Sequence, residues 1–258
     1  MDTAPVKEEP QDKKDEQEYF VRFNFSQRIE HIALMISFTM LSVTGLAQKF
    51  YTASWAQWLI VNLGGIAVTR LVHRAFAVLF VLSVLYHLGY AVNAIFRKHK
   101  KATMLPTFKD FRDVVDSLRY GFGFTDRHPQ FGRFDYRQKF EYWGVIFGST
   151  IIIVSGLFLT YPVFFTNVFP GEYIAAAKEF HGNEATLAVI IIIMWHFYDT
   201  IFKPGIFPSD VSIFTGKISK ERMVEEHSLE YAEITAGAAS EAAAEAPPER
   251  PGAAPTAG

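Results

Sequence analysis

Four histidines lie inside or at the edge of apolar segments as two evenly spaced pairs. His73 and His87 are 14 residues apart, and His181 and His196 are 15 residues apart. A helix rises about 1.5 Å per residue, so each pair spans roughly 21–23 Å, and 14 or 15 steps of about 100° nearly restore the starting face. Two such helices side by side could hold two cofactors, one above the other, across most of a hydrocarbon core about 30 Å thick. This layout is suited to passing electrons through a membrane.

The absence of cysteine narrows the choice of redox centre. The chain of 258 residues is 50% hydrophobic and 16% aromatic, and it has no Cys. Iron–sulfur clusters, covalently attached c-type haem, thiolate zinc sites and disulfides are therefore excluded. Zinc or di-iron sites would need clustered ligands, often with carboxylates, whereas the two histidine levels are about 20 Å apart. The pattern indicates haem b held by pairs of histidines.

Four apolar blocks are near the length that a transmembrane helix needs. They cover about residues 29–47, 66–96, 142–165 and 185–202. The predicted fold is therefore an all-α integral membrane protein, a bundle of four transmembrane helices over residues 21–205 with haems between the helices. Residues 1–20 are highly charged and residues 236–258 are rich in Ala and Pro, so both are expected to be disordered termini. Residues 206–235 form a polar C-terminal segment that is expected to contain a short helix.

The distribution of Lys and Arg predicts the orientation. The loop over residues 97–139 has 11 of them, whereas residues 48–65 contain only Lys49 and residues 166–183 only Lys178. The positive-inside rule then places both termini and the long loop in the cytoplasm, as in a multi-pass protein of the cell inner membrane. No secretory signal peptide is visible in the acidic N-terminal residues. Within the loop, apolar residues from Phe108 to Leu118 recur at helical spacing, which predicts an amphipathic helix on the cytoplasmic surface or under a partner subunit.

The orientation gives each histidine a level in the membrane. The second and fourth apolar helices run in the same direction, so His73 and His181 lie near the extracytoplasmic side and His87 and His196 near the cytoplasmic side. His31 begins the first apolar segment and also lies at the cytoplasmic level. Arg70 and Arg74 flank His73 and are candidate partners for haem propionates. No internal repeat is evident beyond the matching histidine spacing.

Three stretches of the chain resemble a known family. They are RIEHIALMISFTMLSVTGL, TRLVHRAFAVLF and WHFYDTIFKPG followed by GKISKERMVEEH. These resemble the membrane cytochrome b subunit of respiratory formate dehydrogenases and its relatives in nickel–iron hydrogenases and thiosulfate reductases. The resemblance covers about residues 20–230. It implies a four-helix bundle with two b haems, a quinone site near the cytoplasmic haem, and a redox partner subunit on the opposite face. That partner would be an iron–sulfur or cytochrome c type subunit, or a molybdenum or nickel enzyme.

The resemblance and the spacing disagree about the cytoplasmic haem. The family pattern implies that His31 and His196 hold it and that His73 and His181 hold the other haem, with no obvious counterpart of His87. The spacing alone prefers His87 with His196, and we slightly favour this pair. The remaining histidine then serves the quinone or contributes to a third haem. The 15-residue spacing in the fourth helix is also expected to leave one ring rotated by about 100°.

Quinone chemistry requires a proton donor or acceptor beside a haem at the membrane interface. The residues of that type near the cytoplasmic histidines are Glu30, Tyr198, Asp199 and Lys203. Asp199 and Lys203 have the alternative of forming an i,i+4 ion pair at the end of a helix. Their ligand would be a quinone such as menaquinone.

The leading functional hypothesis is an electron-transfer subunit with two b haems. It would exchange electrons between a quinone pool and an extracytoplasmic redox partner, as part of an oxidoreductase complex rather than as a complete enzyme. The alternatives are a histidine-lined ion or metal transporter and a structural membrane anchor subunit. A transporter predicts acidic residues at mid-membrane depth, and the apolar segments contain almost none. We expect membrane lipid, quinone and redox subunits as partners, and no nucleic acid.

Overall fold

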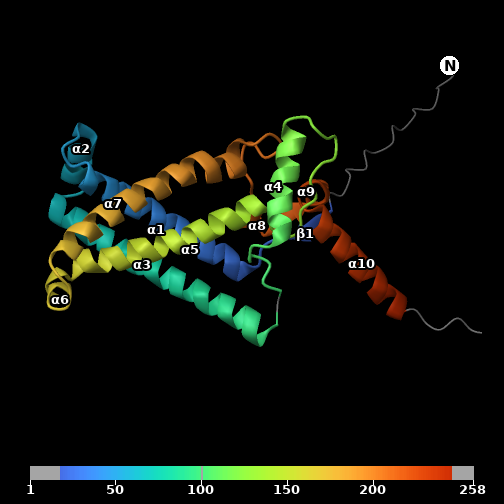
Figure 1. Ribbon diagram of the computed structural model, residues 1–258, viewed down its shortest axis with the longest axis horizontal. Coiled ribbons are helices and arrows are strands. Elements are labelled where there is room, and N and C mark those ends of the chain that lie inside the picture. The colour runs from blue at the N-terminus through green and yellow to red at the C-terminus, as the bar shows by residue number, and fades with distance from the viewer. Residues whose placement is uncertain (1–17, 100, 246–258) are drawn as a thin grey trace, which may run out of the picture.

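Four long helices run along the longest axis of the molecule in the computed structural model (Figure 1). They are α1 (Phe25–Lys49), α3 (Ile66–Val92), α5 (Tyr136–Thr160) and α7 (Glu172–Ile191). Three π-helical stretches extend two of them: η1 (Asn93–Arg97) after α3, and η2 (Ile192–His196) and η3 (Tyr198–Phe202) after α7. The structure describes residues 18–99 and 101–245. The termini expected to be disordered, residues 1–17 and 246–258, lie outside these ranges.

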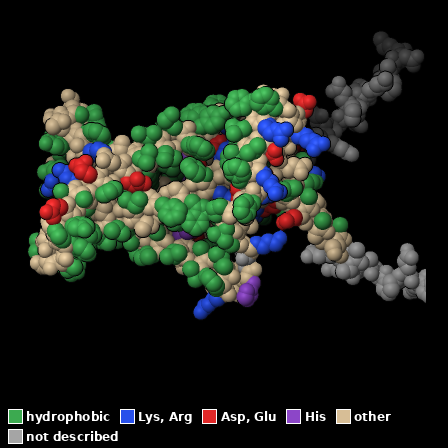
Figure 2. All heavy atoms as spheres, in the orientation of Figure 1, with side chains coloured by type: hydrophobic (Ala, Val, Ile, Leu, Met, Phe, Trp, Pro, Cys, Tyr) green, Lys and Arg blue, Asp and Glu red, His purple; other side chains and the backbone are tan. Residues whose placement is uncertain are grey.

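The two ends of the bundle carry different elements. One end, called here the α2 end, has the short helices α2 (Ser54–Asn62) and α6 (Pro162–Thr166). The other, called the α4 end, has α4 (Phe108–Gly121), α8 (Ser212–Thr215), α9 (Lys220–Glu226) and α10 (Ser228–Glu245). Figure 2 shows hydrophobic side chains over the long helices, with most of the visible Lys and Arg gathered at the α4 end.

The four long helices are long and apolar enough to cross a membrane. With their π-helical extensions they contain 25, 32, 25 and 31 residues. At about 1.5 Å per residue, each exceeds the roughly 30 Å of a hydrocarbon core. Most of their large apolar side chains are exposed to the surroundings rather than buried inside the chain. The predicted four-helix membrane bundle is therefore confirmed.

Small hydroxyl residues fill the interior between the helices. Ser37, Thr44, Thr69, Ser149 and Ser155 are buried. Each hydroxyl group donates to a backbone carbonyl three or four residues earlier in its own helix, as Ser37 does to Ala33 at 2.8 Å. Such residues let helices approach closely where no large side chain stands between them. The packing pairs are α1 with α3 and α5 with α7, and α1 also contacts α7.

The helix boundaries differ most from the predicted ones in two of the long helices, α5 and α7. α5 covers residues 136–160 rather than 142–165, because the capping box of Asp135 and Gln138 starts it earlier and Pro162 follows its end. α7 begins at Glu172 rather than at residue 185. Its first three turns are too polar to be recognised by hydropathy, yet they contain three consecutive alanines, which favour a helix. His181 therefore lies well inside α7.

Both described chain ends are more ordered than predicted. The strand β1 (Tyr19–Val21) pairs antiparallel with β2 (Lys217–Ser219), so Tyr19 and Phe20 belong to a strand rather than to a disordered arm. α10 continues to Glu245, so residues 236–245 are helical rather than part of a disordered tail. Alanine has the highest helix propensity, and this segment is rich in it. The C-terminal segment contains three helices and one strand instead of one short helix.

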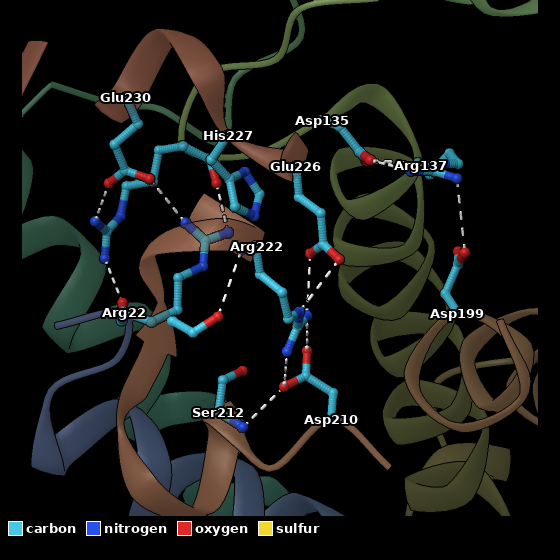
Figure 3. A network of polar contacts seen from close by, with 12 residues as sticks. Arg22, Asp135, Arg137, Asp199, Asp210, Ser212, Arg222, Glu226, His227 and Glu230 are labelled. Carbon is cyan, nitrogen blue, oxygen red and sulfur yellow. Dashed lines mark hydrogen bonds and ion pairs between the residues drawn. The ribbon is translucent and has the colours of Figure 1, made fainter. Parts of the chain in front are cut away.

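A buried network of ion pairs joins these ends to the long loop (Figure 3). Glu230 accepts from Arg22 at 2.9 Å and from Arg133 at 2.5 Å. Burial lowers the pKa of Arg22 to about 10, against the raising effect of Glu230. Burial alone would raise the pKa of Asp210, but hydrogen bonds from Arg222 and Ser212 outweigh it and lower the pKa to about 2. The network fixes β1, α9 and α10 at the α4 end.

The predicted amphipathic loop helix is present as α4, which crosses the α4 end of the bundle (Figure 1). Thr107 and Asp110 form a capping box at its start, and Asp110 accepts from Lys139 at 2.7 Å. Hydrogen bonds from Lys139 and Thr107 outweigh the effect of burial and lower the pKa of Asp110. The opposite face of α4 is apolar and exposed, with Phe108 at 92% and Phe111 at 70% of full exposure.

Candidate functional site

The histidine pair nearest the α2 end joins α3 to α7. The imidazole rings of His73 and His181 face each other with centres 6.3 Å apart and planes inclined at 74°. Both the spacing and the family resemblance predict this pair. The structure therefore brings together two imidazoles that are 108 positions apart in the chain.

The separation of these rings fits a metal ion held between two imidazole nitrogens. A metal–imidazole bond is about 2.0 Å long, and a ring nitrogen lies about 1.1 Å from the ring centre. Two imidazoles on opposite sides of one metal ion therefore have ring centres about 6.2 Å apart. The pair matches this value, so its donor set and its geometry both suit a haem iron.

The outer nitrogen of each ring is held by a neighbouring helix. Thr44 Oγ1 lies 2.9 Å from His73 Nδ1. His181 Nδ1 lies 3.0 Å from the backbone oxygen of Ile152 and 3.2 Å from Ser155 Oγ. Because a carbonyl oxygen only accepts hydrogen bonds, His181 Nδ1 carries the proton, and its Nε2 keeps the lone pair that a metal requires. Metal-binding histidines are commonly oriented in this way.

Two glycines let these rings lie against a helix backbone. A Cβ atom added to Gly45 of α1 would lie 3.1 Å from His73 Cε1, and one added to Gly156 of α5 would lie 3.2 Å from His181 Cε1. Both distances are tighter than ordinary van der Waals contact. A side chain at either position would displace its histidine ring, so the glycines let the two rings keep their positions.

The second histidine pair lies near the α4 end and joins α1 to η2, the π-helical extension of α7. The ring centres of His31 and His196 are 6.1 Å apart, with planes inclined at 35°. His196 Nδ1 lies 3.2 Å from Glu141 Oε2, and a carboxylate in this position orients the ring and leaves Nε2 for a metal. His31 Nδ1 is buried and has no hydrogen-bond partner among the described residues. This pair also has the separation that a two-imidazole iron site needs.

His87 has other partners. Its Nδ1 lies 2.8 Å from Glu30 Oε2, and its Nε2 lies 3.0 Å from the hydroxyl group of Tyr142. Both ring nitrogens are therefore engaged by side chains. The structure places His31 opposite His196, which differs from the pairing of His87 with His196 that the spacing favoured.

The difference arises from the packing of the helices and from the shape of α7. Periodicity shows which residues share a face, but not which helix that face meets, and α7 packs against α5 and α1. The stretch η2 (Ile192–His196) is π-helical and winds less per residue than an α-helix. The 15 residues from His181 to His196 therefore turn through about the same angle as 14 α-helical residues, so the extra residue does not leave one ring rotated by the expected amount.

The predicted propionate partners lie at the start of α3. Arg70 and Arg74 are exposed on either side of His73, and Arg70 lines a surface cavity with Gln48 and Gln57. At the same end, the Lys49 ammonium group donates to the backbone oxygen of Gly182 at 2.8 Å and to two side chains of α7. Lys49 thus ties α1 to α7 beside the His73–His181 pair.

The four residues predicted to bind a quinone do not share one partner. Glu30 lies against His87. Asp199 lies 3.7 Å from Arg137 of α5, rather than forming the alternative ion pair with Lys203 (Figure 3). Tyr198 and Lys203 lie at the start and just after the end of η3. Glu30 and Asp199 thus contact different side chains, His87 and Arg137 respectively.

Sequence reasoning missed Thr44, Ser155, Glu141 and Tyr142, although the sequence contains a signal for them. α1 and α5 both have 25 residues and begin with the same type of capping box. Aligned end to end without gaps, they share identical residues at Gln27, Glu30, Thr39, Val43, Gly45 and Leu46, each 111 positions before its counterpart. The expectation of no repeat beyond the histidine spacing is therefore wrong.

Among the described residues, no group of three or more His, Asp or Glu could hold a metal ion, so the histidine pairs are the candidate metal-binding positions.

Comparisons with known proteins agree with the resemblance seen in the sequence. No protein-family model matches the chain. It is 22% identical over 214 residues to the cytochrome b556(Fdn) subunit of the nitrate-inducible formate dehydrogenase of Escherichia coli K12, which covers 83% of this chain and 91% of that protein. It is 25% identical over 187 residues to the cytochrome b556(fdo) subunit of formate dehydrogenase from the same strain, covering 72% and 80%. With the four membrane-spanning helices, these similarities support a membrane cytochrome b of a respiratory oxidoreductase complex.

Proposed function

We propose that this membrane cytochrome b carries two b haems and transfers electrons across the membrane between a quinone pool and an extracytoplasmic redox partner subunit. The observation that carries the proposal is the presence of two histidine pairs, with ring centres 6.3 Å and 6.1 Å apart, near opposite ends of one bundle. Both separations lie close to the value of about 6.2 Å for two imidazoles on one iron.

The chain holds each haem through side chains of different helices. His73 and His181 are the ligands near the α2 end, and His31 and His196 are those near the α4 end. Bound haem supplies one-electron redox chemistry at each level. Thr44, Ser155 and Glu141 orient the ligand rings, and the surrounding apolar helices keep water away from both levels. Arg70 and Arg74 are placed to pair with propionates at the α2 end.

The two levels are arranged for transfer along the bundle. On α7 and its extension η2 the two ligands are 15 residues apart, which corresponds to roughly 22 Å of helix. The excess of Lys and Arg at the α4 end supports an orientation in the inner membrane with that end on the cytoplasmic side. The α2 end then faces the extracytoplasmic side. There the redox partner docks, either an iron–sulfur or cytochrome c type subunit or a molybdenum or nickel enzyme, by analogy with the formate dehydrogenase complexes.

The quinone site of this proposal lies at the α4 end, near the second haem. The predicted residues for it are divided between Glu30, which lies beside His87, and Tyr198, Asp199 and Lys203 at the end of α7. Both places are on the cytoplasmic side of the proposed orientation. A quinone such as menaquinone would reach either from the bilayer.

Rapid mixing of the purified haem-loaded protein with duroquinol, followed optically, tests this function. Oxidation of one quinol releases two protons and supplies two electrons, one to each haem. We expect the absorbance of reduced low-spin haem b to rise to about the full value obtained with dithionite. Haem that remains oxidised in excess quinol, but is reduced by dithionite, would refute the exchange of electrons with quinones.

A further inference from the structure

The repeat in the sequence corresponds to a repeat in the contacts. Thr44 of α1 holds His73 of α3 at 2.9 Å, and its counterpart Ser155 of α5 holds His181 of α7 at 3.2 Å. Gly45 and Gly156, the next residues, lie against the same two rings. The pair α1–α3 and the pair α5–α7 are thus two versions of one unit, and His73 and His181 are counterparts that face each other.

The same correspondence holds near the α4 end. Glu30 of α1 contacts His87 Nδ1 at 2.8 Å, and its counterpart Glu141 of α5 contacts His196 Nδ1 at 3.2 Å. The second oxygen of each carboxylate, Oε1, is buried without a partner among the described residues. His87 and His196 therefore occupy equivalent positions in the two units.

One exchange breaks this equivalence. The residue after Glu30 is His31, whereas the residue after Glu141 is Tyr142. His31 faces His196 with ring centres 6.1 Å apart, and Tyr142 faces His87 with ring centres 5.6 Å apart. The bundle thus has two related positions at the α4 end. One holds two imidazoles, and the other, called here the mate site, holds Glu30, His87 and Tyr142.

The mate site does not fit a haem iron. Two ligand atoms on opposite sides of one metal ion are about 4 Å apart, because each bond is about 2 Å long. His87 Nε2 and the Tyr142 oxygen are only 3.0 Å apart and share a hydrogen bond. Where the first unit has His31 facing His196, the second unit has Tyr142 facing His87. The second position therefore holds a hydrogen bond between two helices instead of a pair of metal ligands.

We propose that the mate site binds a quinol. The Tyr142 oxygen accepts a hydrogen bond from one of the ring hydroxyl groups of the quinol. This proposal rests on the quinone function above and assigns its site. In the neutral His87 ring, Nδ1 donates to the Glu30 carboxylate and Nε2 accepts from the Tyr142 hydroxyl group. The phenolic oxygen keeps its lone pairs and accepts a further hydrogen bond. A quinol presents hydroxyl donors on an apolar ring, which is the complementary chemistry.

The surroundings of the mate site suit a ligand that arrives from the bilayer. The side chains of Glu30 and His87 are 13% and 35% exposed, so the site lies at the edge of the bundle. Leu85, Tyr86 and Leu88 around it are each more than half exposed. Cβ atoms added to Gly89 and Gly144 would meet nothing within 4 Å. Because Glu30 precedes His31 in α1, a quinol bound here lies beside the helical turn that supplies a ligand to the haem.

Equilibrium binding of 1,4-dihydroxynaphthalene to the haem-loaded protein tests the proposal. The haems are kept reduced with dithionite, so that only binding is measured. We expect Tyr142→Phe to raise the dissociation constant about 5- to 10-fold, as the loss of one hydrogen bond predicts. Tyr90→Phe is the matched control, because Tyr90 lies on α3, three residues after His87, and its hydroxyl group accepts from Asn24 instead. The control is expected to change the constant less than twofold.

Further measurements distinguish a failure of the mate site from a failure of the proposed quinone function. With the unchanged protein, 1,4-dimethoxynaphthalene has the same ring without hydroxyl donors and is expected to bind at least about tenfold more weakly. Equal binding of the two compounds would overturn the proposal without any substitution. Normal binding by Tyr142→Phe together with weakened binding by Tyr198→Phe would overturn the mate site and keep a quinone site at the end of α7. Failure of the unchanged protein to bind the naphthalenediol, while duroquinol still reduces its haems, would overturn only the mate site. If duroquinol also fails to reduce them, the proposed function falls as well.

Discussion

The ring of His31 lies with its centre 6.1 Å from that of His196, so the first and the last long helix of the bundle meet near the α4 end. This contact favours one of the two ligand sets that the sequence allows, namely His31 with His196. It also leaves His87 to Glu30 and Tyr142, at distances that correspond to hydrogen bonds. The two helix pairs of the bundle are therefore equivalent in their packing, but they differ in the side chain that follows the glutamate: His31 in one and Tyr142 in the other.

Replacing His31 and His87 separately tests the ligand assignment. His31→Ala is expected to reduce the haem content from two to one per chain, because it removes one of two iron ligands. His87→Ala is expected to keep two haems, since both of its ring nitrogens contact side chains. Haem is counted as the pyridine complex against protein mass. Loss of a haem in His87→Ala with retention in His31→Ala would contradict the assignment.

Glu141 is expected to set the potential of the haem near the α4 end through its contact with His196. Glu141→Gln removes a negative charge beside a ligand, which favours the reduced iron and raises that midpoint potential by about 60 mV, the equivalent of one charged hydrogen bond. Glu30→Gln is the matched control, because Glu30 occupies the equivalent position beside His87. Optical redox titration of both variants measures the effect. Equal shifts in the two variants would contradict a role for Glu141 through His196.

A side chain at position 45 is expected to disturb only the pair near the α2 end. Gly45→Val would bring methyl groups against His73, because even a Cβ atom would lie 3.1 Å from the ring. We expect loss of the haem between His73 and His181 and retention of the other, seen as the disappearance of one of two steps in a redox titration. Gly89→Ala is the control, since its Cβ would meet nothing within 4 Å. Two unchanged steps in Gly45→Val would contradict the proposed packing.

The contact between Asp210 and Arg222 predicts a pH dependence at the α4 end. Hydrogen bonds lower the pKa of Asp210 to about 2, below its ordinary value of 3.8. A lowered pKa means that the carboxylate stabilises the folded segment fully above about pH 4, by about 2 kcal/mol, and that this contribution is lost as the pH falls toward 2.

Amide hydrogen exchange in α9, corrected for the intrinsic effect of pH, measures this contribution. Asp210→Asn is expected to weaken protection at pH 7 and to remove its decrease between pH 4 and 2. Asp126→Asn in the exposed part of the loop is the control. Equal protection of the unchanged protein at pH 4 and pH 2 would contradict the expected titration.

The sequence predicts the long helices well and their contacts less well. Length and apolarity are properties of one segment, so four membrane-spanning helices and the amphipathic α4 follow from them. The pair His73–His181 also follows, because the spacing and the resemblance agree. The partner of His196 depends on which helices pack together, and neither periodicity nor hydropathy contains that information. The start of α7 was missed because its first turns are too polar for hydropathy to recognise, and the strand at Tyr19 because it depends on pairing with the distant β2.

The counterparts Glu30 and Glu141 show what the sequence could have provided. Their equivalence is visible once α1 and α5 are aligned, but identities at six of 25 positions become meaningful only when the contacts repeat as well. The replacement of His31 by Tyr142 in the second unit then has a physical meaning. It removes a metal ligand and adds a hydroxyl group at an equivalent position.

The central claim is that this chain holds one haem b at each end of its bundle, and the number of haems per chain tests it most directly. Purified haem-replete protein is expected to contain two b haems per chain, with reduced-minus-oxidised bands of low-spin haem b. The double variant His31→Ala, His73→Ala is expected to contain none. A haem content of zero or one in the unchanged protein, or two haems retained in the double variant, would contradict the claim.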